Sequence, residues 1–116
     1  MLVGCASRSP GPEKQQYLLR ADVQLADGPQ QVPARIGIGR VVLADYLDQP
    51  GIVILSEGNK VRAARQHLWA EPLETGVRIY MRDALADRVG YPVSADTARR
   101  LNWEYRLDIG LDQLHG

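Results

Sequence analysis

The apolar residues near both ends of this chain recur with the period of a strand. In residues 17–25 every second position is apolar, which predicts a half-buried strand with its buried side at Leu19, Ala21, Val23 and Leu25. Residues 104–111 alternate in the same way and predict a last strand with buried positions at Tyr105, Leu107, Ile109 and Leu111. The first strand is followed by a predicted turn at residues 26–29, Ala-Asp-Gly-Pro.

Three apolar runs in the middle of the chain predict three further strands. The first, residues 34–43, contains Gly37 and Gly39, and glycines inside a strand indicate a bulge or the close approach of another part of the chain. The second, residues 51–55, is apolar throughout, as in a strand buried on both faces. A tight turn then joins it to the third, residues 61–65, as a hairpin.

Helical periodicity is clearest at residues 71–90. Apolar residues recur there at every fourth position and predict a buried stripe made of Leu73, Val77, Met81, Leu85 and Val89. Charged residues fall on the other side, where Glu74 is placed to pair with Arg78 one turn later. The stripe therefore predicts one long amphipathic helix with its arginines in solvent.

Together these segments predict the order β-β-β-β-α-β in a single α/β domain. Two short helical segments are predicted as well, at residues 43–48 and 94–101. A long amphipathic helix beside a buried strand indicates a mixed β-sheet covered by helices. Because only one long helix is found for the two faces of such a sheet, we expect the domain to be incomplete at the C-terminus, as a fragment of a longer domain.

The first five residues, Met-Leu-Val-Gly-Cys, have the form of a bacterial lipobox, in which Cys5 receives the lipid. The residues after Cys5 lack apolar periodicity and are rich in Ser, Pro and Gly, as in a flexible tether. We therefore expect a lipobox and tether at residues 1–16 and a single periplasmic domain at residues 17–116. A signal peptide needs a longer apolar stretch before the box, so a free cysteine near a disordered start is the alternative.

Composition and charge exclude several classes of protein. The chain has 116 residues, 45% of them hydrophobic and 24% charged, which is ordinary for one globular domain. Its 14 basic and 14 acidic residues give no net charge, which argues against a general attraction to nucleic acid or anionic lipid. No run approaches the roughly 18 apolar residues of a membrane-spanning helix. Cys5 is the only cysteine, so a thiolate zinc site is not expected.

The titratable residues do not form a recognisable catalytic or metal-binding set. His67 and His115 are the only histidines, and neither has a carboxylate or a second histidine at ligand spacing. Glu71 and Glu74 stand where the start of a helix favours negative charge, which explains them without chemistry. Phosphate-loop and nucleophile motifs are missing from the sequence. The sequence therefore predicts a protein that is not an enzyme and has no cofactor and no bound metal.

Two motifs make the chain resemble a known family. Residues 41–53 end in Asp-Tyr-Leu-Asp-Gln-Pro-Gly-Ile-Val, and residues 69–73, Trp-Ala-Glu-Pro-Leu, open the long helix. This pair resembles the ABC-type transport auxiliary lipoproteins of the paraquat-inducible protein C type. The likeness extends to the Tyr-Leu-Leu at residues 17–19, the Tyr-Arg-Leu at residues 105–107 and the lipobox Cys5, so it spans nearly the whole chain.

The resemblance implies an anticodon-binding-domain-like α/β fold and a non-catalytic lipoprotein on the periplasmic face of the outer membrane. It also implies service to an intermembrane lipid transport system. The partner would be the mammalian-cell-entry (MCE) domain transport protein of that system, and the membrane would be reached through the lipidated N-terminus. Nucleic acid is not expected as a partner, and assembly of several copies is left open.

A partner-binding surface is expected where exposed aromatic residues gather. Tyrosine and tryptophan are common interface hot spots, so the candidate interface consists of Asp45, Tyr46, Leu47 and Trp69. Core packing is the competing role for Trp69, which is placed to fix the helix start against the hairpin. The alternative for the whole chain is a soluble small-ligand-binding module of the same architecture.

Overall fold

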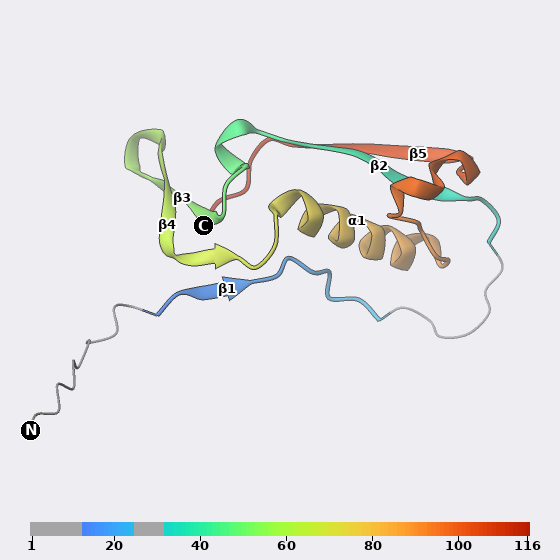
Figure 1. Cartoon of the computed structure of the whole chain (residues 1–116), viewed down its shortest axis with the longest axis horizontal. Helices are drawn as coiled ribbons and strands as arrows, with labels where there is room; N and C mark the ends of the chain where they lie inside the picture. Colours follow the sequence, from blue (N-terminus) through green and yellow to red (C-terminus); the bar gives the residue numbers. More distant parts are fainter. Residues whose placement is uncertain (1–12, 25–31) are drawn as a thin grey trace, which may run out of the picture.

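A computed structural model of the chain describes residues 13–24 and 32–116, without the side chains of residues 99–101. The strands and the helix in this part are β1 (Gln15–Tyr17), β2 (Ile36–Leu43), β3 (Gly51–Ser56), β4 (Lys60–Trp69), α1 (Leu73–Val89) and β5 (Tyr105–Leu111). Short 3₁₀ helices lie at η1 (Asp45–Leu47), η2 (Glu57–Asn59) and η3 (Thr97–Asn102). The predicted order β-β-β-β-α-β is confirmed, as are the predicted short helical segments (Figure 1).

The strands form two small sheets rather than the single sheet that we expected. One is mixed, with the strand order β1-β4-β3, and the other consists of β2 and β5 in parallel. The turn η1 and Pro50 separate β2 from β3, so the chain leaves one ladder before it enters the other. The fold class itself, mixed α/β with a helix packed on the strands, is confirmed.

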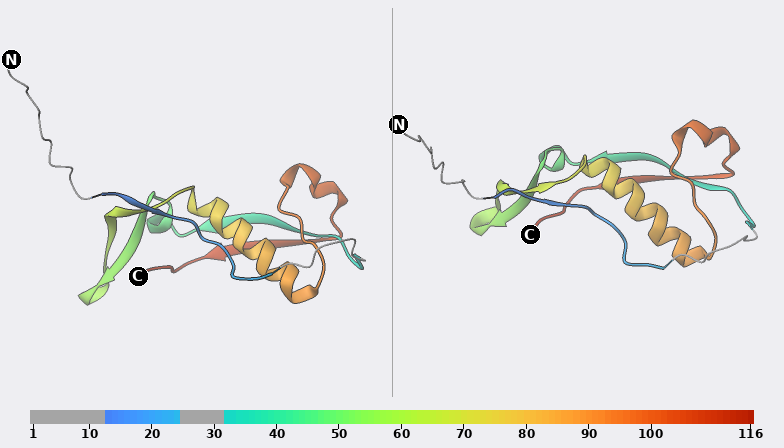
Figure 2. Two further views of the ribbon diagram at one scale, coloured as in Figure 1. Left: turned by 90° about the horizontal axis from the view of Figure 1, so that it is seen from below. Right: turned by 60° about the horizontal axis from the view of Figure 1, so that its bottom comes forward.

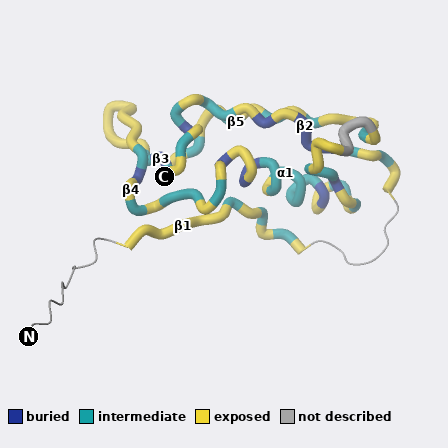
Figure 3. Tube along the Cα trace, viewed as in Figure 1, coloured by how far each residue is buried: buried dark blue, intermediate teal, exposed yellow. Residues whose placement is uncertain are grey.

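Helix α1 covers one face of β2, and the core lies between them (Figures 1 and 3). The buried cluster consists of Ile38, Val41, Leu47, Val53, Leu73, Val77, Ala86 and Val93. The predicted apolar stripe of the helix does face the core. Leu73 and Val77 are buried in the cluster, whereas Met81, Leu85 and Val89 are only partly buried against it. Gly90 ends the helix at a positive φ of 82°, a conformation that glycine adopts without steric cost.

The hairpin of β3 and β4 is confirmed, but β3 is not buried on both faces. Gly51 and Val53 are buried near its start, whereas Leu55, near the tip, is 38% exposed. The turn between the strands has two consecutive residues at positive φ, Gly58 and Asn59. The hairpin tip projects beyond α1, and the last residues of β3, Leu55 and Ser56, are exposed (Figure 2).

The first strand lies earlier in the chain than we predicted. β1 begins at Gln15, inside the segment assigned to the tether, and runs parallel to β4 with Gln15 opposite His67. Residues 18–24 are not a strand, although their exposure alternates as expected, with Leu19, Ala21 and Val23 half-buried. Leu19 packs over the helix at Gly76. This segment is therefore held by side-chain contacts with the helix and not by the hydrogen bonds of a β-ladder.

Two predictions fall outside the described residues. The lipobox Cys5 and most of the tether lie in residues 1–12, and most of the turn predicted at residues 26–29 lies in residues 25–31. Within residues 13–24 and 32–116, none of the helices combines the length and the apolar character needed to span a membrane.

Candidate functional site

Of the predicted interface residues, the structure brings Leu47 and Trp69 together at one depression near the start of α1, and not all four residues face solvent. Asp45 is exposed, and Tyr46 is half-buried with its hydroxyl donating to the carbonyl oxygen of Asp112 at 2.9 Å. Leu47 is only 1% exposed and belongs to the core, so it is not available to a partner. Its burial follows from the 3₁₀ turn, which directs Leu47 inward while Asp45 stays outside.

Trp69 lies between two neighbouring depressions that also share Leu73. One, of about 200 Å³, is lined by Leu47, Ile52, Val53, Trp69, Leu73, Leu114, His115 and Gly116. The other, of about 390 Å³, is lined by Asp48, Gln49, Pro50, Trp69, Ala70, Glu71, Pro72 and Leu73. We call these two depressions together the Trp69 groove.

The backbone holds Trp69 in place from two directions. Its N–H donates to the carbonyl oxygen of Pro50 at 2.8 Å, and the next residue, Ala70, donates to the carbonyl oxygen of Tyr17 at 2.7 Å. The indole is half-buried and packs against the core, which agrees with its predicted packing role and leaves part of the ring at the groove surface. Sequence reasoning missed Leu114 and His115 as lining residues, because nothing in the pattern brings the last residues back to this point.

An ion pair secures the rim of the groove. Nη1 of Arg20 donates to Oε1 of Glu71 at 2.5 Å. The hydrogen bond to Arg20 lowers the pKa of Glu71 below its ordinary value, and Glu71 raises the pKa of Arg20. The pair ties the segment after β1 to the start of α1, so Glu71 has a structural role at the groove.

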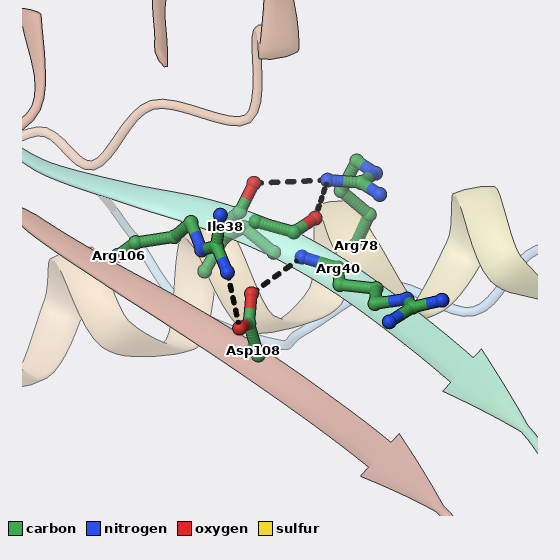
Figure 4. A network of polar contacts seen from close by, with 6 residues as sticks. Ile38, Arg40, Arg78, Arg106 and Asp108 are labelled. Atoms are coloured by element: carbon green, nitrogen blue, oxygen red, sulfur yellow. Dashed lines mark hydrogen bonds and ion pairs between the residues drawn. The ribbon is translucent and has the colours of Figure 1, made fainter. Parts of the chain in front are cut away.

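A second polar network surrounds a bulge in β2 (Figure 4). The register between β2 and β5 shifts between Ile38 and Val41, which confirms the predicted irregularity near the two glycines. A side chain at Gly37 would overlap the ring of Trp103, and one at Gly39 would overlap Arg106 and Asp108, so the close approach is confirmed too.

Two charged side chains satisfy the backbone at this bulge. Nη1 of Arg78 donates to the carbonyl oxygens of Ile38 at 2.9 Å and Gly39 at 2.6 Å. From β5, Oδ1 of Asp108 accepts the N–H of Arg40 at 2.8 Å, and its Oδ2 accepts from Arg106 at 2.9 Å. Arg78 was predicted to point into solvent, and the structure corrects this: its side chain is 17% exposed and lies against β2 while keeping the predicted pair with Glu74.

Acid should destabilise the fold through these two carboxylates. Hydrogen bonds lower the folded-state pKa of Glu71 from 4.5, and those from Arg40 and Arg106 lower that of Asp108 from 3.8. A carboxylate with a lowered folded-state pKa stabilises the fold above its unfolded-state pKa and loses this effect as the pH falls through the folded-state value. We therefore expect the urea midpoint to fall as the pH drops below 4.5 and further below 3.8.

The measurement is the urea midpoint as a function of pH. The double variant Glu71→Gln and Asp108→Asn should be less stable at neutral pH and should show a flatter acid limb. Asp87→Asn, at an exposed position of α1, is the control and should retain the full acid dependence. An unchanged acid limb in the double variant would contradict the assignment.

The site has the features of a binding surface. Among the described residues no group of three or more His, Cys, Asp or Glu side chains is arranged to hold a metal ion. The groove offers an indole and aliphatic side chains, with the exposed Asp48 in its lining and the exposed Asp45 on the preceding turn. These groups can hold an apolar side chain and attract a neighbouring cation.

Comparison with known families identifies the class of protein. The family model for the ABC-type transport auxiliary lipoprotein component matches residues 17–116. The chain therefore belongs to this family, whose description is that of an auxiliary lipoprotein component of ABC-type transport.

Two solved structures share the fold. One is the crystal structure of an uncharacterized protein, with 22% identity and a TM-score of 0.69; the alignment covers 90% of this chain and 61% of that one. The other is protein XCC0632 from Xanthomonas campestris, of the DUF330 family, with 14% identity, a TM-score of 0.52 and coverage of 84% and 53%. The chain thus spans less than two thirds of the length of either structure. No curated protein matches it.

Proposed function

We propose that the chain is anchored by a lipid on Cys5 to the periplasmic face of the outer membrane. There it serves an intermembrane lipid transport system by docking on the MCE-domain transport protein, without catalysis of its own. The observation that carries this proposal is the family match over residues 17–116. The lipobox at the start of the sequence supports the anchor, because a diacylated cysteine adds about 0.8 kcal/mol of membrane affinity per buried methylene.

The Trp69 groove is the proposed docking site. An interface hot spot is typically an aromatic residue in a partly desolvated pocket surrounded by contacts that exclude water. Trp69 has this environment, and the exposed Asp48 lines the groove directly after the turn that contains Asp45 and Tyr46. The proposed interface is therefore Asp45, Tyr46, Asp48 and Trp69, without the buried Leu47.

The anchor is tested by mass spectrometry of Cys5. The precursor, expressed in a Gram-negative host, should yield an N-terminal peptide that begins at an acylated Cys5, recovered with the outer-membrane fraction. Cys5→Ser should abolish the modification and release the protein from that fraction, while leaving its fold unchanged, because the buried cluster is formed by residues between Ile38 and Val93. An unmodified Cys5 in the membrane fraction, or a wholly soluble wild-type protein, would refute the anchor.

A soluble ligand-binding module is the second candidate, and the groove is the observation that favours it. The larger depression, about 390 Å³, is near the lower end of the range for small-molecule sites, which is roughly 300–1,000 Å³. Small apolar ligands that compete with the partner for Trp69 would support this candidate. Such ligands can be titrated while tryptophan fluorescence is recorded. Comparing the wild type with Trp103→Phe separates the signal of Trp69 from that of Trp103.

A further inference from the structure

The tip of the β3–β4 hairpin exposes an apolar pair. Leu55 and Val61 lie directly opposite each other in the antiparallel ladder and therefore share one face of the hairpin. They are 38% and 48% exposed. Because successive strand residues alternate between faces, the neighbouring pairs, Ser56 with Lys60 and Ile54 with Arg62, lie on the opposite face.

Basic residues follow this pair closely along the chain. Between Leu55 and His67 the chain has three basic residues, Lys60, Arg62 and Arg65, against the single acidic residue Glu57. The difference, three minus one, is a local charge of plus two in a chain whose net charge is zero. All three basic residues are exposed, and within the described residues none of them makes an ion pair, unlike Arg78 and Arg82 on the helix. No acidic side chain of the described residues competes with an external anion for these three charges.

The hairpin also lies at the end of the molecule where β1 begins. β1 is parallel to β4, with Gln15 opposite His67, so the start of β1 lies on the side where β4 begins, at Lys60. In Figures 1 and 2 the start of β1 and the hairpin lie at the same end of the elongated molecule. A lipid at Cys5 would thus hold this end toward the bilayer.

We propose that the hairpin tip, defined as Leu55, Lys60, Val61 and Arg62, is a second membrane contact that binds a bilayer surface containing anionic lipid. With an apolar pair on one face and basic residues on the other, the tip is amphipathic, which matches the boundary between acyl chains and negative headgroups. The position of the tip relative to the membrane rests on the proposed anchor at Cys5, whereas its affinity for lipid is a property of the folded domain.

Two other occupants fit the tip less well. A second copy joining by strand addition at the β3 edge would meet Gly116, whose backbone already bonds to the carbonyl oxygen of Val53 at 3.0 Å and the N–H of Leu55 at 3.3 Å. Two exposed aliphatic side chains are also far from the roughly 1,200 Å² that a stable interface buries. A polyanion would use the cations but has no use for Leu55 and Val61.

The first test is co-sedimentation of the full chain carrying Cys5→Ser, which cannot be acylated at this position. It should bind vesicles of phosphatidylcholine and phosphatidylglycerol in a three-to-one ratio and not vesicles of phosphatidylcholine alone. Arg62→Gln should lower the partition coefficient about fivefold, since one basic residue near an anionic surface contributes on the order of 1 kcal/mol. Arg88→Gln, on the exposed side of α1, should have little effect. Equal losses in the two variants, or no binding, would overturn the proposal.

The second test reports on insertion. In the Cys5→Ser background, Val61→Cys and Val42→Cys give single cysteines at matched strand positions, 48% and 52% exposed in the wild type. A polarity-sensitive fluorophore at position 61 should shift to the blue with anionic vesicles, and one at position 42 should not. A concentration-dependent shift without vesicles would indicate a second copy, and binding to heparin and to vesicles without a shift would indicate a polyanion site. Either result overturns the proposal while leaving the Cys5 anchor untouched.

Discussion

Replacing Ile38 by alanine should lower the free energy of unfolding by about 3 kcal/mol. Ile38 is 0% exposed and lies in the cluster that joins β2 to α1. Removing a buried isoleucine side chain down to alanine typically costs about 2–5 kcal/mol, through lost burial and the cavity that remains. Equilibrium urea unfolding followed by circular dichroism measures the change.

Val42 is the matched control, because it lies on the same strand but is 52% exposed. Val42→Ala should change the free energy of unfolding by less than about 0.5 kcal/mol. If the two substitutions cost the same, the face of β2 that packs on α1 has been assigned wrongly.

Replacing Arg78 by methionine should cost about 2 kcal/mol or more. Methionine retains much of the aliphatic packing but removes the donor that satisfies the carbonyl oxygens of Ile38 and Gly39 at the bulge. Hydrogen bonds to charged groups contribute roughly 1.5–3 kcal/mol, whereas the pair with Glu74 is near the surface and adds little. Urea unfolding again provides the measurement.

Arg82→Met is the control for this second prediction. Arg82 lies one turn further along α1, and its ion pair is with the adjacent Asp83 rather than with the backbone of β2. We expect a change within about 0.5 kcal/mol. A loss at Arg82 as large as that at Arg78 would mean that the bulge does not depend on the helix for its hydrogen bonds.

The contrast between these two arginines shows where sequence periodicity stops being informative. Helical spacing places both arginines on the polar side of the helix. The side chain of Arg82 is indeed the more exposed of the two, at 38% against 17% for Arg78. Arg78 differs because the bulge in β2 presents two carbonyl oxygens within reach of its long side chain. The glycines that permit the bulge were visible in the sequence, but the partner of the bulge was not, because Arg78 is about forty residues away.

The strands illustrate the same limit. The β3–β4 hairpin was predictable, since its two strands are joined by a short turn and pair locally. The parallel pairing of β2 with β5 joins distant segments through α1, and no local pattern records it. After β1, the apolar residues that alternate within residues 18–24 are indeed the more buried ones. Leu19, however, is buried by contact with the helix rather than within a sheet. An alternating pattern therefore indicates which side chains are buried, but it does not indicate which segments form backbone hydrogen bonds with one another.

The candidate site was predicted in part for similar reasons. Residue type agrees with the half-buried positions of Trp69 and Tyr46, since aromatic residues combine a large apolar ring with a polar group, although Tyr105 is 63% exposed. It was misleading for Leu47, because a one-turn helix can direct adjacent residues to opposite environments. The contribution of Leu114 and His115 to the groove depends on the return of the chain after β5, which only the structure reveals.

The docking claim is tested most directly by site-specific photo-cross-linking in intact cells. A photoreactive amino acid is placed at Asp48, on the rim of the Trp69 groove, and for comparison at Arg88, near the far end of α1. We expect position 48 to form an adduct with the MCE-domain protein of the same transport system, position 88 to form none, and Trp69→Ala to abolish the adduct at position 48 while the protein remains folded. Absence of the adduct at position 48, or equal adducts at both positions, would contradict docking through the groove.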